Sequence, residues 1–390
     1  MRALRTIEGV EVRGKRVLVR IDADVDLDEN GNIEPGGDHR LLGCLPTIQY
    51  LRERGARIIL LSHLGRPEGN VVDTLRMARI GDLLSQHVPG NVLPVTVGPE
   101  AREAGNSLED GDVLLLENVR FDPKEERNDP GFAGELASLG ELYVNEAFAV
   151  SHRTHASLVA ITAFLPSYAG LLFAKEVRAL EQILEHPEPP VVAVISGAKL
   201  ETKVALLRNL LPKVEVLLTG GGIANMFLKT RGFSVGVSLI EPDMEQEVRA
   251  LSQAFKKKIV VPLDARVARK DHAVTSLIVA VDAVESADSI YDIGPQTVQR
   301  YCSIVSGANT CVWNGPLGKV ELPEFQEGTR AFAKCLQASR AYSVVGGGDT
   351  VTALRQMRLT EGFGHVSSGG GAMIAFLEGA LLPAVEALRA

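Results

Sequence analysis

The sequence predicts an α/β protein with mostly parallel sheets and helices on both faces of each sheet. Short apolar runs alternate along the chain with segments in which apolar residues recur at helical spacing. Turns rich in glycine or arginine follow many of the apolar runs directly, where a parallel sheet places its ligand-binding loops. A proline-rich stretch at residues 187–190 interrupts the alternation, which then restarts. We therefore expect two domains of the same class.

The first half of the chain contains predicted strands at residues 16–21, 58–61, 113–116 and 142–144. Segments of helical periodicity lie between them, at residues 41–54, 74–87 and 131–139. This order predicts βαβ units, which connect parallel strands. Residues 171–186 are predicted to form one further helix, which ends at the proline-rich stretch and connects the two domains.

The second half contains the remaining predicted strands. They lie at residues 191–195, 214–219, 259–261, 276–281, 310–313 and 342–345. Residues 343–372 contain two glycine turns, and each turn leads into a predicted helix, at residues 351–357 and 373–378.

Composition and charge argue against several classes of protein. A hydrophobic content of 45% and a charged content of 23% are typical of a globular protein. The net charge of −8 argues against a general binder of nucleic acids or membrane surfaces. Charges throughout residues 1–20 exclude a signal peptide, and no apolar run approaches the ~20 residues that a membrane span needs. We expect a cytosolic protein.

The four cysteines lie far apart and form no C-x-x-C pair. They are Cys44, Cys302, Cys311 and Cys335. This spacing predicts buried, reduced thiols and does not support a zinc site or a disulfide framework.

Charged side chains follow the predicted strands of the first half or open the next helix. They are Asp22, Asp24, Arg40, His63, Arg66, Arg120, Arg153 and His155. A single arginine is more often part of a solvated ion pair, but four arginines, with histidines beside two of them, favour a site for carboxylate or phosphate. His152 and His155 form a weak metal-binding pattern, and the arginine between them favours an anion site.

Glycine turns follow the predicted strands of the second half. They include Ser196-Gly197-Ala198-Lys199, Gly220-Gly221-Gly222, and the turns at 346–350 and 368–372. Glycine lets the backbone approach a ligand, and the free N–H groups of a helix N-terminus attract phosphate. Lys199 and Lys203 share a helix face from which both can reach phosphates, although lysines are often simply solvated. Asp349, beside one turn, can hold a magnesium ion on phosphate oxygens.

The two commonest nucleotide-binding patterns, G-x-x-x-x-G-K-[ST] and G-x-G-x-x-G, are both missing. A single glycine turn often does no more than join a strand to a helix, but two in succession favour phosphate chemistry. With a small-anion site in one domain and a polyphosphate site in the other, the sequence predicts phosphoryl transfer across a cleft.

Along nearly its whole length the sequence resembles the phosphoglycerate kinases. The motifs that carry the resemblance occur in the family's order. They are Ser62-His63-Leu64-Gly65-Arg66-Pro67, Leu115-Leu116-Glu117-Asn118-Val119-Arg120-Phe121, His152-Arg153-Thr154-His155-Ala156-Ser157, Gly197-Ala198-Lys199, Trp313-Asn314-Gly315-Pro316, and the turns at 346–350 and 368–372. The resemblance implies two Rossmann-like, three-layer αβα domains joined by a hinge helix.

The resemblance also implies how the domains are divided and what they do. A 3-phosphoglycerate-binding domain occupies residues 1–170, and a tail at about 380–390 packs back on it. An interdomain helix and linker at 171–190 leads to a nucleotide-binding domain at 191–379. The implied reaction is reversible transfer of the acyl phosphate of 1,3-bisphosphoglycerate to Mg-ADP, giving 3-phosphoglycerate and ATP, by hinge-bending closure of a monomer.

By position, the resemblance assigns site residues in three sets. The acid-binding set is Asp22, Ala23, Asp24, Arg40, His63, Leu64, Gly65, Arg66, Arg120 and Arg153. The nucleotide-binding set is Lys203, Asn314, Glu321 at the ribose, Gly347, Gly348, Asp349 and Thr350, with Asp349 on Mg²⁺. Arg40, Lys199, Gly370 and Gly371 are implied to steady the moving phosphoryl group.

Several positions depart from the family's pattern. The family usually has Asp-Phe-Asn-Val-Pro where this sequence has Asp22-Ala23-Asp24-Val25-Asp26, and an ionised aspartate accepts hydrogen bonds without donating any. Ser196, Thr202 and Ile290 replace a glycine, an aspartate and a glycine near the nucleotide. Because Ile290 stands beside Tyr291, we expect a narrower adenine pocket.

These departures leave two other functions open. One is a kinase of the same chemistry that acts on a different small acid, because the change at Asp24 lies in the acid site. The other is a non-catalytic nucleotide-binding relative, because three changes lie near the nucleotide. Turnover of other acids with ATP distinguishes the first, and nucleotide binding without turnover distinguishes the second.

Overall fold

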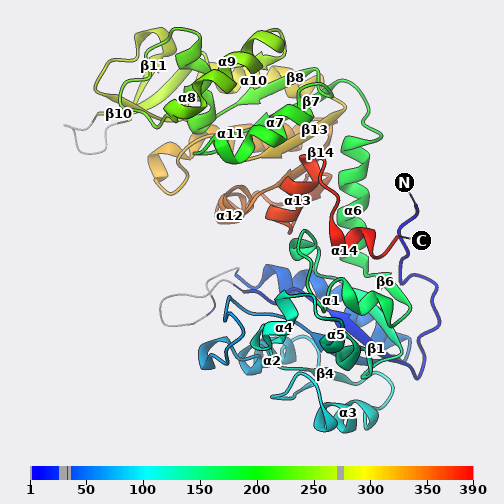
Figure 1. Cartoon of the computed structure of the whole chain (residues 1–390). Helices are drawn as coiled ribbons and strands as arrows, with labels where there is room; N and C mark the ends of the chain where they lie inside the picture. Colours follow the sequence, from blue (N-terminus) through cyan, green and yellow to red (C-terminus); the bar gives the residue numbers. More distant parts are fainter. Residues whose placement is uncertain (1, 26–32, 34–36, 270–275, 390) are drawn as a thin grey trace. The chain divides into compact units, whose positions relative to one another are not determined.

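The computed structural model describes residues 2–25, 33, 37–269 and 276–389. The chain folds into two compact units. The first unit comprises Met1–Arg178 and Leu381–Ala390, and the second comprises Ala179–Ala380. Each unit is built on a parallel sheet with helices packed against it (Figure 1), as the alternating sequence pattern predicts.

The first unit contains a six-stranded sheet in the order β3-β4-β2-β1-β5-β6, in which all neighbours are parallel. Its strands are β1 (Arg16–Arg20), β2 (Arg57–Leu61), β3 (Asn91–Val92), β4 (Val113–Leu115), β5 (Leu142–Asn145) and β6 (Ser167–Ala169). Its helices are α1 (His39–Glu53), α2 (Ala78–Ser85), α3 (Pro99–Asn106), α4 (Pro123–Glu126), α5 (Pro130–Ala137) and α14 (Pro383–Glu386). Helix α6 (Leu171–Leu184) continues from the first unit into the second.

The apolar runs of the first unit form central strands that are buried on both faces. Residues 17–19 of β1 and 58–61 of β2 are fully buried. Helix α1 contributes Leu41, Ile48 and Leu51 to the same core. A parallel sheet covered on both faces requires such continuous apolar runs, which is why the sequence reveals these strands.

Several elements of the first unit differ from the prediction, which lacks helices α3, α4 and α14. Strands β3 and β6 are not predicted because neither contains an apolar run; both residues of β3 are exposed. Helix α2 begins at Ala78, later than predicted, because side chains bind backbone groups just before it. Glu117 Oε1 accepts a hydrogen bond from Met77 N at 2.9 Å, and Asn118 Nδ2 donates to Leu75 O at 3.0 Å.

The two ends of the chain lie side by side in the first unit (Figure 1). Arg5 N donates to Leu388 O at 3.0 Å, and Leu4 forms an antiparallel bridge with Arg389. Farther along the tail, Ala384 N donates to Ser151 O at 3.1 Å. Residues 381–389 thus complete the surface of the unit that contains the N-terminus.

The second unit contains a six-stranded parallel sheet in the order β15-β14-β13-β7-β8-β9. Its strands are β7 (Val191–Ile195), β8 (Val216–Thr219), β9 (Ile259–Val260), β13 (Thr310–Asn314), β14 (Tyr342–Gly346) and β15 (His365–Val366). Its helices are α7 (Val204–Leu210), α8 (Gly221–Thr230), α9 (Glu245–Ala254), α10 (Pro295–Ser306), α11 (Glu327–Ala338), α12 (Gly348–Gln356) and α13 (Gly370–Leu377). In the described part of the chain, no helix is both long and apolar enough to cross a membrane.

A second, antiparallel sheet lies in the second unit in the order β11-β10-β12. The predicted strand at 276–281 is its edge strand β11 (Leu277–Ala280). The partners β10 (Asp264–Arg269) and β12 (Asp288–Ile293) are not among the predicted strands. Charged residues begin both partners, so neither reads as an apolar run.

Our prediction of four reduced cysteines is wrong for two of them. Cys302 in α10 and Cys335 in α11 form a disulfide with a Cα–Cα distance of 5.5 Å. They are 33 residues apart in the sequence, and only the packing of α10 beside α11 brings them together. Cys44 and Cys311 are buried free thiols, as predicted, and burial raises the pKa of both.

Candidate active site

The loops after β1 and β2 are tied together at the carboxyl edge of the first sheet. The side chain of Ser62, directly after β2, is fully buried. Its Oγ accepts from Ala23 N and donates to Ile21 O, both at 3.0 Å. The polar residues on the two loops therefore lie beside one another.

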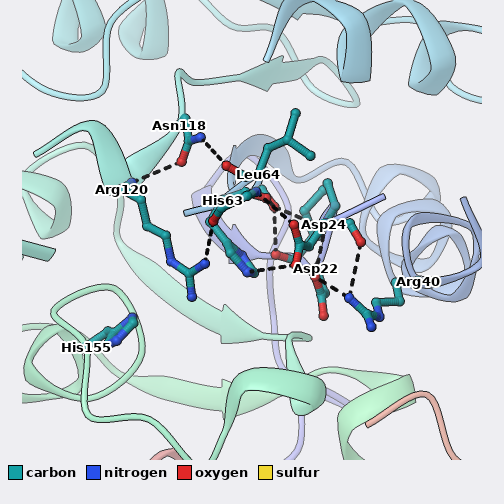
Figure 2. Close-up of polar contacts among 12 residues, drawn as sticks. Asp22, Asp24, Arg40, His63, Leu64, Asn118, Arg120 and His155 are labelled. Carbon is teal, nitrogen blue, oxygen red and sulfur yellow. Dashed lines mark hydrogen bonds and ion pairs between the residues drawn. The ribbon is translucent and has the colours of Figure 1, made fainter. Parts of the chain in front are cut away.

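Asp24 lies among three other residues of the predicted acid-binding set (Figure 2). Its Oδ1 accepts from Gly65 N at 2.8 Å. Its Oδ2 lies 3.6 Å from Arg40 Nη1 and 3.8 Å from His63 Nε2. Arg40 Nη1 also donates to the backbone oxygen of Asp24 at 3.2 Å. Gly65 has a φ of 64°, a conformation that favours glycine, so its N–H is directed at Asp24 without backbone strain.

Asp22 lies next to this cluster and is buried. One carboxylate oxygen, Oδ1, accepts from Asp24 N at 3.1 Å. The other, Oδ2, has no hydrogen-bond partner in the described part of the chain. Burial raises the pKa of Asp22, nearby Arg40 opposes this, and the charge of Asp24 raises it further. Asp26, the last residue of the altered motif, lies outside the described residues.

A fully buried arginine, Arg20, contacts Nδ1 of His63, the ring nitrogen other than the one near Asp24. Arg20 Nη2 lies 3.1 Å from His63 Nδ1, and Arg20 Nε donates to Ser157 Oγ at 2.9 Å. Because arginine only donates, Nδ1 of His63 accepts and its proton resides on Nε2. Burial, together with the nearby arginines Arg20 and Arg120, lowers the pKa of His63 well below its usual value. The ring is therefore a neutral donor at Nε2.

Arg20 is absent from the predicted set because it lies inside the apolar run of β1, where residues read as core. A charged residue between the apolar run Val17-Leu18-Val19 and Ile21 was the signal that could have revealed it. Arginine is almost never fully buried without a partner, so this position called for a buried polar group nearby.

Arg120 is held in place by Asn118 (Figure 2). Asn118 Oδ1 accepts from Arg120 N at 3.1 Å, and its Nδ2 donates to Leu64 O at 2.8 Å. Arg120 Nη1 donates to Gly65 O at 2.7 Å, and its Nε lies 3.5 Å from Glu126 Oε1. Burial lowers the pKa of Arg120 to about 10, so the side chain still carries its charge at neutral pH.

Ala23 and Leu64 contribute buried apolar side chains, and their polar contacts in this cluster are made by backbone groups. Arg66 is exposed and, among the described residues, takes part in no ion pair. Arg153 is partly buried, and its Nε has no hydrogen-bond partner in the part of the chain that the structure describes.

His155 lies apart from the Asp24 cluster, below Arg120 in Figure 2. Burial, with the positive charges of Arg120 and Arg20, lowers the pKa of His155 to about 3. Its ring is therefore neutral at physiological pH. Within the described residues, no group of three or more histidine, cysteine or acidic side chains has a geometry that suits a metal ion.

The second unit has a cavity of about 330 Å³ at the carboxyl edge of its sheet. Most residues of the predicted nucleotide-binding set line it, together with Lys199. The lining residues are Ser196, Gly197, Ala198, Lys199, Thr202, Lys203, Asn314, Gly315, Pro316, Gly347, Gly348, Asp349, Thr350 and Ile374. The cavity thus combines two lysines, one exposed carboxylate and three glycine-containing turns.

Asn314 connects the lysine side of this cavity to the glycine turn. Lys203 Nζ donates to Asn314 Oδ1 at 2.6 Å, and Asn314 Nδ2 donates to Gly346 O at 2.9 Å. Gly347 has a φ of 105°, and a Cβ there would lie 2.6 Å from Asn314 Nδ2, so only glycine fits. Burial lowers the pKa of Lys203, and the charges of Glu378 and Asp349 oppose this.

Three predicted residues lie outside the lining of this cavity. Glu321 is exposed in a turn. Gly370 and Gly371 begin α13, and a Cβ on Gly370 would lie 3.2 Å from Gly348 N. The second glycine turn therefore packs closely against the first.

A narrow slot of about 10 Å³ lies in the same unit. Apolar groups on α8, β12 and the loop after β13 line it, including Ala224, Leu228, Ile290 and Leu317. Ile290, where the sequence departs from the family's glycine, is part of this lining.

Asp349 has a position that suits Mg²⁺ bound with a nucleotide. It is exposed in the first turn of α12 and lines the cavity beside Lys203 and Thr350. Mg²⁺ is commonly bound by one or two carboxylates together with phosphate oxygens and water. The donor set present therefore fits a metal that arrives with its nucleotide.

The chain matches known proteins over nearly its whole length. The family model for phosphoglycerate kinase matches residues 7–380. The phosphoglycerate kinase of Thermomicrobium roseum is 46% identical over 391 residues and covers 99% of both chains. That of Moorella thermoacetica is 45% identical over 389 residues and covers 98% of both chains.

Solved structures agree as well. The phosphoglycerate kinase of Coxiella burnetii has a TM-score of 0.89 at 39% identity, and the match covers 99% of both chains. That of Pyrococcus horikoshii has a TM-score of 0.86 at 30% identity and covers 99% of this chain and 98% of its own. From these matches over nearly the full length, the chain belongs to the phosphoglycerate kinase family.

Proposed function

We propose that this family member transfers the acyl phosphate of 1,3-bisphosphoglycerate to Mg-ADP, reversibly, to give 3-phosphoglycerate and ATP. The observation that carries the proposal is the cavity of about 330 Å³ in the second unit, where two lysines, glycine turns and one exposed carboxylate surround space for a polyphosphate. Phosphoryl transfer needs little covalent chemistry from the protein, so positioning and charge stabilisation provide the catalysis.

The acid would bind at the carboxyl edge of the first sheet. The neutral ring of His63 would donate from Nε2 to an oxygen of the acid, since its Nδ1 is held by Arg20. The unpartnered Oδ2 of Asp22 would accept from the hydroxyl group of the acid. The guanidinium groups of Arg40, Arg66, Arg120 and Arg153 would bind its carboxylate and phosphate groups, which suit the arginine fork.

The nucleotide would bind in the cavity of the second unit. Lys203, Asn314 and the turn at 347–350 would contact its phosphates, and Asp349 would hold Mg²⁺, which neutralises phosphate charge when bound. Arg40, Lys199, Gly370 and Gly371 are assigned to the moving phosphoryl group, and Glu321 to the ribose. We assign residues 1–170 with the tail at 380–390 to the acid, 191–379 to the nucleotide, and 171–190 to the connection. Hinge-bending closure, a monomeric state and a cytosolic location stay predictions.

A coupled assay with 3-phosphoglycerate and Mg-ATP tests the proposal, with the Arg40→Ala variant measured beside the wild type. We expect robust turnover in the wild type and a loss of at least ~100-fold in the variant, because one donor to developing charge contributes that much. Binding of Mg-ADP, measured by calorimetry, should be the same in both proteins. Binding of Mg-ADP to wild-type protein without any turnover would contradict the proposal.

A further inference from the structure

The strongest unexplained feature of the acid site is the ion pair between Asp24 and Arg40. Two oxygens of Asp24 contact the same guanidinium nitrogen: the backbone oxygen at 3.2 Å and Oδ2 at 3.6 Å. The Asp24 carboxylate also lies 3.8 Å from Nε2 of His63, so one side chain contacts two groups that the acid would use.

Backbone hydrogen bonds in the loops after β1 and β2 fix the position of Asp24 beside Arg40. Gly65 N donates to Oδ1 of Asp24 at 2.8 Å, and Asp24 N donates to Asp22 at 3.1 Å. The first bond holds the carboxylate from the loop after β2, and the second holds the backbone of Asp24 within the loop after β1. The side chains of Asp24 and Arg40 remain 32% and 28% exposed, so a ligand from solvent can reach the pair.

A carboxylate fixed on the protein competes with a carboxylate or phosphate that arrives from solution. Tethering gives it an effective concentration in the millimolar range or above. An incoming acid must displace this carboxylate before it can bind Nη1 of Arg40.

We propose that Asp24 is an internal counter-ion of Arg40 that lowers the affinity of the site for its acid. This inference rests on the proposed function, because it assumes that the acid binds at Arg40. Asp24 is a positioning residue in this role: it holds Arg40 while the site is empty and releases it when the acid binds.

The test is binding of 3-phosphoglycerate to nucleotide-free protein and, separately, of Mg-ADP, measured by calorimetry for the wild type and Asp24→Asn. Asparagine keeps an oxygen for the N–H of Gly65 and removes the charge. We expect the affinity for 3-phosphoglycerate to rise about tenfold, which corresponds to ~1.4 kcal/mol. The affinity for Mg-ADP should not change, which also establishes that the variant is folded.

Asp110→Asn is the matched control. Asp110 pairs with Arg57 at 3.1 Å, at the start of β2 and hence at the opposite edge of the same sheet. This variant removes the same charge from the same unit. Because the Asp110–Arg57 pair is exposed and distant from the acid site, the affinities for 3-phosphoglycerate and Mg-ADP should stay within about twofold of wild type. An equal gain in this control would overturn the inference in favour of a general effect of net charge.

A double-mutant cycle tests whether Asp24 acts through Arg40. In an Arg40→Ala background, Asp24→Asn should raise the acid affinity by no more than about threefold, because the pair is already broken. An undiminished tenfold gain, or weaker binding in Asp24→Asn alone, would overturn the inference. Acid binding is measured without nucleotide and without turnover. An absence of turnover would therefore contradict the proposed function without affecting the binding test of Asp24.

Discussion

Reduction of the disulfide between Cys302 and Cys335 is expected to destabilise the second unit and leave the first unit unchanged. The bond connects α10 to α11, and both cysteines lie within Ala179–Ala380. For a separation of 33 residues, the loop-entropy relation gives about 3.7 kcal/mol of stabilisation at 25 °C. For a unit of about 200 residues, this corresponds to a fall in Tm of roughly 7–15 °C.

Differential scanning calorimetry with and without a reducing agent measures this effect. Saturating Mg-ADP identifies the transition of the second unit, because a ligand that binds only the folded form raises its Tm. The variant Cys302→Ser with Cys335→Ser serves as the control: it should melt like reduced wild-type protein and should not respond to reductant. A wild-type protein whose two transitions are both insensitive to reductant would refute the reasoning.

Two further predictions concern buried charges, one in each unit. Glu146 accepts hydrogen bonds from Thr47 Oγ1, Leu172 N and Phe173 N, and burial raises its pKa to about 7. A carboxyl group whose pKa is raised in the folded state contributes stability that is complete below pH ~4.5 and is lost as the pH rises through ~7. The free energy of unfolding of the first unit should therefore fall between pH 5 and 8 in the wild type. Urea unfolding should show a weaker dependence on pH in Glu146→Gln. Equal slopes in both proteins would contradict this. Lys203→Met should weaken Mg-ADP binding roughly 10–150-fold in calorimetry, the range expected for a lost charge-assisted hydrogen bond. The exposed control Lys213→Met should leave this affinity unchanged. Similar Mg-ADP affinities in the wild type and both variants would exclude Lys203 from the site.

The parallel sheets could be predicted from the sequence because their central strands are buried on both faces and therefore read as continuous apolar runs. Strand β3 could not be predicted, since it has two exposed residues and depends on pairing with β4. Strands β10 and β12 contain charged residues, and cross-strand pairing decides their structure. In each of these cases the deciding contacts are distant in the sequence.

Some residues of the candidate site could also be predicted from the sequence, whereas others depend on contacts between distant parts of the chain. Residues directly after strands, such as His63 and Arg120, can be predicted because the carboxyl edge of a parallel sheet is where ligands bind. The buried residue that contacts His63 could not be predicted in this way. Arg20 lies within a strand, and its contact with His63 depends on the register of β1 beside β2. The partnership of Asp24 with Arg40 likewise requires the observed loop geometry, although the sequence shows that residue 24 is unusual.

The position of the last ten residues has a consequence for how the chain is made. Leu381–Ala390 belong to the first unit, where Leu388 O accepts from Arg5 N. During translation, residues 179–380 leave the ribosome before residues 381–390 do, and units generally fold as their residues emerge. The second unit can therefore fold while the first still lacks its closing segment.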